Sequence, residues 1–267
     1  MKKTLFLIVC GLVIISMAVA QTGTAAPKPR NHLRNGGATC GQDPILPTDG
    51  STLAFDYTYP GAATWYYVHL KGGHSYSVDV WDSVDTVIGG QATLTLMATD
   101  CQSNLPTTDV TSVDPDLSND FGARISWIQS ADSDAYISVG TTDPSGSTYS
   151  IRVTDTTLHS TRWSTWSGFG TQYALVNTTA TAISGVLTVT ESTGPQHTLN
   201  VTLPANGEAF RIVVASGGDL NVGASKLGFA QFAFVGPPGA IMADAVIINA
   251  TATVIEPVDF GPRNYQH

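Results

Sequence analysis

The sequence predicts an all-β protein in which two consecutive antiparallel β-sandwiches follow a signal peptide. Three observations predict this class. The 267 residues include 26 Gly and 14 Pro and are rich in Ser and Thr, a composition typical of turns and short strands. Apolar and polar residues alternate in many short runs, which is the period of a half-buried strand. The chain after residue 20 shows no amphipathic helical pattern of ten or more residues.

Residues 1–20 have the pattern of a secretory signal peptide. Lys2 and Lys3 precede an apolar stretch over residues 5–19, and residues 18–20 form an A-x-A cleavage site. A membrane anchor is the alternative, but the apolar stretch is shorter than the ~20 residues of a spanning helix. We therefore expect a protein that is secreted, or located in the periplasm or at the cell surface, with no stable membrane insertion after cleavage.

Export leaves two cysteines, Cys40 and Cys101, and an oxidising compartment favours a disulfide between them. A metal-binding pair and a catalytic thiol are the alternatives. No C-x-x-C spacing supports the former, and no histidine stands out as a partner for the latter.

The first predicted sandwich covers residues 40–156, after a flexible Pro/Gly-rich segment at residues 21–39. In the run 76–80, for example, Tyr76, Val78 and Val80 share one face of a strand. About seven such runs in so short a stretch are typical of an antiparallel sandwich. The runs fall at 53–57, 65–70, 76–80, 93–97, 123–127, 135–139 and 148–153.

The second predicted sandwich covers residues 157–258 and is followed by a tail at 259–267. Turn clusters at 204–207 and 236–239 separate neighbouring runs. The predicted strands fall at 173–177, 185–189, 199–203, 210–214, 229–235, 245–249 and 252–255.

Charge separates the two halves and excludes some functions. The whole chain has a net charge of −9, and residues 40–156 alone hold 15 Asp, no Glu and three basic residues. This balance argues against a nucleic-acid binder, whose affinity depends on Lys and Arg. A hydrophobic content of 42% argues against a disordered chain.

The clustered aspartates raise the hypothesis of a Ca²⁺ site at Asp114, Asp116 and Asp120, because carboxylate oxygens on a loop suit calcium. The spacing lacks the Gly and Glu of an EF-hand. The alternative is that these residues only form turns and keep the surface soluble.

Two tryptophans, Trp163 and Trp166, lie in the string W-S-T-W-S at the predicted domain junction. Packing of a linker or core is one explanation. The other is a platform for a sugar ring, because aromatic faces suit amphipathic ligands.

Motifs of catalysis are absent from the sequence. It contains no HExxH, no G-x-S-x-G, no P-loop and no GxGxxG after a strand, and its six histidines are scattered. We therefore predict a protein that is not an enzyme, while a hydrolase site assembled only in space stays an alternative.

Residues 45–155 resemble the bacterial pre-peptidase C-terminal domain family. The resemblance lies in the aromatic run 64–70 with the following K-G-G-H-S-Y-S-V, the run 93–96, and the ending D-A-Y-I-S-V-G with G-S-T-Y-S-I-R-V. It implies a jelly-roll-like, non-catalytic accessory or binding module, which holds calcium in some members. The second half resembles immunoglobulin-like bacterial surface modules only generically.

These observations favour an exported, non-catalytic binding or accessory protein of the bacterial cell exterior that recognises protein or polysaccharide, with Ca²⁺ as its one candidate cofactor. The alternative is a structural envelope or extracellular-matrix component that assembles through sheet edges.

Overall fold

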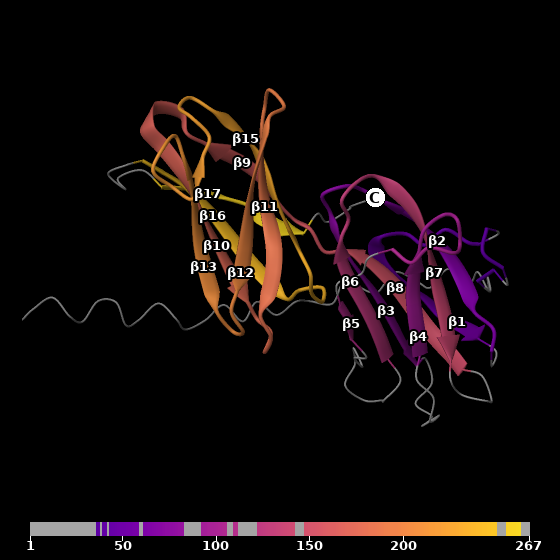
Figure 1. Cartoon of the computed structure of the whole chain (residues 1–267). Coiled ribbons are helices and arrows are strands. Elements are labelled where there is room, and N and C mark those ends of the chain that lie inside the picture. Colours follow the sequence, from indigo (N-terminus) through magenta and orange to yellow (C-terminus); the bar gives the residue numbers. More distant parts are fainter. Residues whose placement is uncertain are drawn as a thin grey trace, which may run out of the picture. The chain divides into compact units, whose positions relative to one another are not determined.

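The computed structural model describes residues 36–37, 39–41, 43–58, 61–82, 92–105, 109–111, 122–141, 147–249 and 255–262. These residues belong to one compact unit, 34–267. They form strands and a single 3-10 turn, so the predicted all-β class is confirmed (Figure 1). Among them, no helix is long and apolar enough to cross a membrane.

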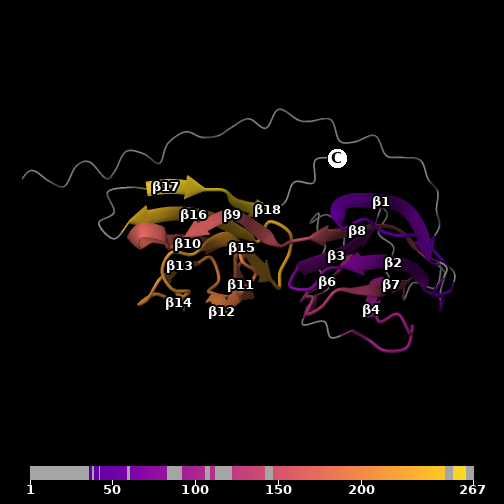
Figure 2. The same cartoon turned by 90° about the horizontal axis from the view of Figure 1, so that it is seen from above.

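The first sandwich consists of a five-stranded sheet in the order β1-β8-β3-β6-β5 and a three-stranded sheet in the order β2-β7-β4, and all pairs are antiparallel. Figure 2 shows the two layers. The strands are β1 (Asp49–Thr58), β2 (Thr64–Leu70), β3 (Ser75–Asp82), β4 (Ala92–Met97), β5 (Asp109–Thr111), β6 (Gly122–Ile128), β7 (Ser133–Thr141) and β8 (Ser147–Asp155).

The second sandwich consists of two five-stranded sheets, in the orders β14-β13-β10-β16-β17 and β12-β11-β15-β9-β18. All pairs are antiparallel except β13 with β14. The elements are β9 (Leu158–Ser164), η1 (Trp166–Gly168), β10 (Phe169–Asn177), β11 (Ile183–Glu191), β12 (Gln196–Leu203), β13 (Glu208–Val214), β14 (Leu220–Asn221), β15 (Leu227–Phe234), β16 (Ile241–Asn249), β17 (Ile255–Val258) and β18 (Phe260–Pro262).

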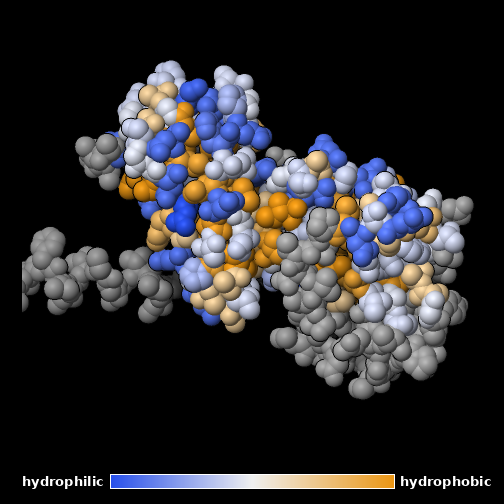
Figure 3. Space-filling view, in the orientation of Figure 1, coloured by the Kyte–Doolittle hydropathy of each residue, from blue (hydrophilic) through white to orange (hydrophobic). Residues whose placement is uncertain are grey.

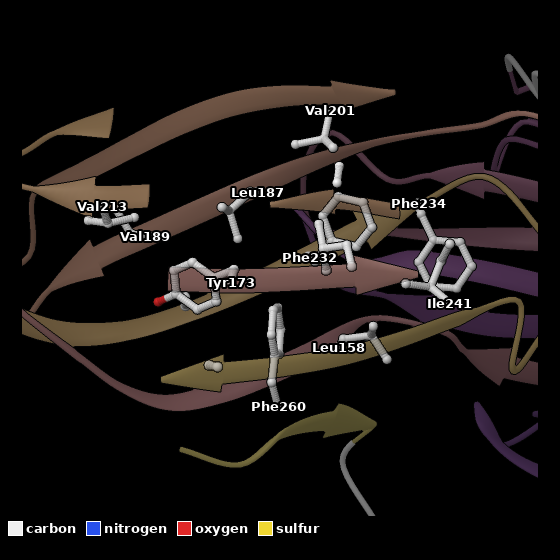
Figure 4. Packing of buried hydrophobic residues seen from close by; sticks show 14 of the residues in the cluster. Leu158, Tyr173, Leu187, Val189, Val201, Val213, Phe232, Phe234, Ile241 and Phe260 are labelled. Atoms are coloured by element: carbon white, nitrogen blue, oxygen red, sulfur yellow. The ribbon is translucent and has the colours of Figure 1, made fainter. Parts of the chain in front are cut away.

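Each sandwich buries its own apolar core, as the alternation of the strands predicts. In the first core the hydroxyls of Tyr66 and Tyr149 lie 2.6 Å apart, so a hydrogen bond joins β2 of one sheet to β8 of the other. The second core is rich in aromatic rings, among them Tyr173, Phe232 and Phe260 (Figure 4). Buried hydroxyls need a partner, and the tyrosine pair meets this need within the core.

The connection between the sandwiches is short and buried. Only Thr156 and Thr157 separate β8 from β9. Thr156 Oγ1 donates to Ser75 Oγ at 2.9 Å, and the Ser75 amide donates to Thr157 Oγ1 at 2.9 Å. Beside them His74 Nδ1 lies 2.7 Å from Asp155 Oδ2. Burial raises the pKa of Asp155, but hydrogen bonds from His74 and Thr157 outweigh burial, and the net pKa is lowered.

The structure differs from the sequence prediction at three places. Gly37, expected in a flexible segment, forms a bridge with Trp65 of β2. Strand β9 and strand β18 were not predicted, and β18 lies where a tail was expected. Phe260 of β18 is buried in the second core, and its ring centre lies 5.3 Å from that of Tyr173. A lone apolar residue between Asp and Gly gives no periodic signal, which is why the sequence did not show it.

The burial of Phe260 predicts that the last described strand stabilises the second sandwich. Phe260→Ala should lower the free energy of unfolding by about 3–5 kcal/mol, the usual cost of truncating a buried aromatic side chain. Ile255→Ala, at an exposed position of β17, should change it by less than about 0.5 kcal/mol. Urea denaturation measures both. Equal midpoints for the two variants would show that β18 does not belong to the core.

Candidate functional site

The candidate site is the outer face of the sheet β2-β7-β4. Because side chains alternate along a strand, burial of Tyr66 and Val68 in the core turns the odd-numbered residues of β2 outward. We call the outward side chains of this sheet the aromatic platform. Its described members are Trp65, Tyr67 and His69 of β2, Asp134, Tyr136 and Ser138 of β7, and Thr93, Thr95 and Met97 of β4.

The strand register aligns these side chains in rows across the sheet. Tyr67 lies opposite Tyr136, which lies opposite Met97 on the next strand. The ring centres of Tyr67 and Tyr136 are 5.2 Å apart with planes at 53°, a tilted contact of the kind that aromatic pairs favour. The next row, Trp65 and Ser138 followed by Thr95, combines one aromatic ring with two hydroxyls.

Asp134 organises the polar end of the platform. His69 Nδ1 lies 2.6 Å from Asp134 Oδ1, and the Tyr67 hydroxyl donates a hydrogen bond to the same carboxylate. This hydrogen bond is the main cause that raises the pKa of Tyr67 to about 12. The bonds from Tyr67 and His69 lower the pKa of Asp134, so the carboxylate is ionised at neutral pH. The His69 and Asp134 side chains are 62% and 43% exposed and accessible to a ligand.

The segment around Ile45, which precedes β1, adds one more residue to the platform. Ile45 forms a parallel bridge with Tyr67, and its side chain is 62% exposed. Directly paired residues present their side chains on the same face, so Ile45 continues the row of Tyr67, Tyr136 and Met97. The Leu46 amide donates to Tyr67 O at 2.9 Å, which holds this segment on the edge of β2.

The disulfide fixes this segment. The structure joins Cys40 to Cys101 with a Cα–Cα distance of 6.1 Å, so the predicted pairing is confirmed. Cys40 lies between the two bridges of the segment with β2, and Cys101 lies in the turn after β4. The covalent link therefore connects the chain beside one edge strand of the sheet to the turn after the other.

The platform combines apolar and polar groups that can contact a ligand. Among its described members the ionisable groups are the His69–Asp134 pair and two tyrosines, and none is Lys or Arg. Rings and aliphatic side chains offer apolar contact, while hydroxyls and the carboxylate offer hydrogen bonds. On the view of Figure 3, hydrophobic residues reach the surface of both sandwiches, so hydrophobicity alone does not single out this site.

The two tryptophans proposed from the sequence differ in their exposure to solvent. Trp163 is fully buried in the second core, where its indole N–H donates to Thr190 O and Phe229 O at 3.2 and 3.0 Å. Residue 228 must be glycine at this close approach, since a Cβ there would collide with Thr190 O and lie 2.9 Å from the Trp163 indole nitrogen. Trp163 thus offers no face to a ligand, which corrects the two-tryptophan platform. Trp166 is 55% exposed, at the 3-10 turn.

The predicted calcium ligands Asp114, Asp116 and Asp120 lie outside the described residues, so this site stays a prediction. Within the described ranges, no cluster of three or more His, Cys, Asp or Glu suits a metal ion.

Asp79 is the most deeply buried charge among the described residues of the first sandwich. Arg124 Nε donates to its Oδ1 at 2.5 Å, and an Arg152 guanidinium N–H donates to Oδ2 at 2.8 Å. The three residues lie opposite one another on β6, β3 and β8. Because both carboxylate oxygens are paired, this cluster is structural, and we do not assign it a ligand.

Sequence reasoning missed the platform although its residues were within predicted strands. The signal was the sequence T-W-Y-Y-V-H-L, in which Trp65, Tyr67 and His69 share a parity opposite to that of Val68 and Leu70. The sequence did not show that the distant strand carrying Asp134 and Tyr136 pairs with this strand.

Comparisons with known proteins add little. No family model and no curated protein matches the chain. Among solved structures, the full extracellular region of zebrafish Gpr126/Adgrg6 is similar with 9% sequence identity and a TM-score of 0.23. The match covers 82% of this chain and 31% of that one. A similarity this low carries no inference about fold or function, so the class of protein is defined by its own architecture, an all-β chain with an aromatic sheet face.

We expect the disulfide to hold the segment around Ile45 against the edge of β2. The two cysteines are 61 residues apart in sequence. In the chain-entropy model, the double variant Cys40→Ser/Cys101→Ser should therefore lose roughly 4 kcal/mol of the free energy of unfolding. Hydrogen exchange of the Leu46 and Tyr67 amides should become faster, because both bond across this edge. Exchange at Leu187, in the second core, is the control. Unchanged exchange at Leu46 and Tyr67 would show that the segment stays in place without the disulfide.

Proposed function

We propose that the protein is an exported, non-catalytic binding protein of the bacterial cell exterior that recognises polysaccharide through the aromatic platform. The observation that carries this proposal is the row from Ile45 through Tyr67 and Tyr136 to Met97, with the His69–Asp134 pair beside it. The pattern of the sequence N-terminus supports export.

A sugar ring fits the chemistry of this face. The apolar C–H faces of a sugar pack against aromatic rings, and its hydroxyls exchange hydrogen bonds with carboxylate, imidazole and hydroxyl groups. Tyr67 and Tyr136 supply the first contact, and Asp134 and Ser138 supply the second. The row runs across several strands of a sheet, which suits an extended polymer rather than a small molecule enclosed in a pocket.

Charge favours a neutral polymer. The described platform holds no Lys or Arg, and residues 40–156 contain 15 Asp against three basic residues. An acidic polysaccharide would therefore be repelled at long range. Binding of neutral glucans or chitin should accordingly persist in salt, because it does not depend on charge steering.

Truncation of the platform tyrosines tests the proposal. In pull-down experiments with insoluble cellulose, chitin and starch, Tyr67→Ala and Tyr136→Ala should each weaken binding to the recognised polymer at least about tenfold. Loss of an aromatic hot spot costs about 2 kcal/mol or more, and 1.4 kcal/mol corresponds to a factor of ten. Tyr67→Phe should keep most of the affinity, since it keeps the ring.

Trp166→Ala is the matched control, because it removes an exposed aromatic ring from the second sandwich. It should bind like the unaltered protein, and all variants should melt at similar temperatures. Loss of binding in Trp166→Ala with full binding in Tyr67→Ala would place the ligand elsewhere. Retention on immobilised protein such as gelatin, with none on any polysaccharide, would contradict the proposed ligand class.

A further inference from the structure

Strand β12 is an edge strand of the second sandwich. It pairs with β11 over its whole length, from Gln196 opposite Thr190 to Leu203 opposite Ile183, with no shift in register. Its other side has no strand partner among the described residues. An edge strand of this length offers a row of backbone N–H and C=O groups to another strand.

The hydrogen-bond alternation tells which residues face the free side. The Glu191 amide donates to Pro195 O, so odd-numbered residues of β12 bond to β11. The Val235 amide donates to Ser184 O, which agrees, because the even-numbered residues of β11 then bond to β15. The backbone groups that point away from β11 therefore belong to the even-numbered residues of β12. These are Gln196, Thr198, Asn200 and Thr202, and all four side chains are exposed.

Most other edges of the described sheets carry features that discourage strand addition: β5 has only three residues, and Asn104 bridges Met97 at the end of β4. Strand β14 has two residues, β17 contains Pro257, and β18 ends at Pro262. Strand β2 is covered by the segment around Ile45, and β1 has irregular register. By contrast, residues 196–203 include no Pro, no Lys, no Arg and no acidic residue.

We propose that β12 is a self-association site, at which a second copy of this chain adds its own β12 in antiparallel orientation. An antiparallel pair centred on Leu199 places Thr198 opposite Asn200 of the second copy, and Gln196 opposite Thr202. In this register the free N–H and C=O groups of all four even-numbered residues are paired on both strands. The strand is thus complementary to itself, and it places no Lys, Arg, Asp or Glu side chain opposite its own copy.

The pairing joins the two β12-containing sheets into one continuous sheet across a twofold axis. Such an isologous contact closes after two copies and leads to a dimer rather than a fibre. Across this axis Leu199 meets Leu199 of the second copy. Leu199 is partly buried against the core, so the contact also extends the apolar layer.

The oligomeric state tests this site directly. Light scattering on the purified protein should show a mass that doubles as concentration rises. Asn200→Pro removes one free-edge N–H without touching the bonds to β11, and should stay monomeric. Asn200→Lys, which places like charges on the two strands, should do the same. Thr188→Lys, on the neighbouring strand β11, is the control and should still form dimers.

Two cysteine variants test the same site without depending on whether the variants at Asn200 fold. With oxidised glutathione, Leu199→Cys should cross-link two chains, because paired Cα atoms at the axis lie within disulfide range. Thr202→Cys, on the same strand but far from its own copy, should not. A monomer at every concentration, or equal cross-linking of both variants, would overturn the proposal. Dimers that persist in Asn200→Pro and Asn200→Lys would assign self-association to another surface. Polysaccharide binding by monomeric Asn200→Pro shows separately whether the platform acts alone.

Discussion

The pleat of strand β2 is the constraint on which the site depends. Tyr66 points inward and shares a hydrogen bond with Tyr149 of the opposite sheet, so its neighbours Trp65 and Tyr67 must point outward. A shift of one residue would bury the platform and expose the core, and burial of Val68 and Leu70 opposes this. The same alternation in β7 brings Tyr136 to the outer face beside Tyr67. The same strand register thus determines both the packing of the core and the outward position of the platform residues.

The sequence predicted the elements better than their partners. Alternation located most strands, and export with two remaining cysteines predicted the disulfide, because these features depend on local pattern and count. Strand β9 was not predicted because buried and exposed residues do not alternate regularly along it. The edge contacts of Gly37 and Ile45 escaped because isolated bridges have no period, and the platform needed the pairing of β2 with a strand distant in sequence.

The two proposed surfaces serve different purposes and lie on different sandwiches. The proposed ligand contact lies on the platform of the first sandwich, and the proposed contact between copies lies on strand β12 of the second. A dimer joined at β12 carries two platforms, and two weak contacts with one polymer chain raise the apparent affinity well above that of one. Thr156 and Thr157 are buried, and both bond to Ser75 of the first sandwich.

Mapping of ligand contacts by NMR tests the platform most directly. The isotope-labelled protein is titrated with soluble oligosaccharides of the polymer that it retains. We predict that the resonances that shift belong to the outward residues of β2, β7 and β4, with the Trp65 indole and the Tyr67 and Tyr136 amides among the largest changes. Shifts confined to the second sandwich, around Trp166 or elsewhere, would contradict the assignment of this sheet face as the binding site.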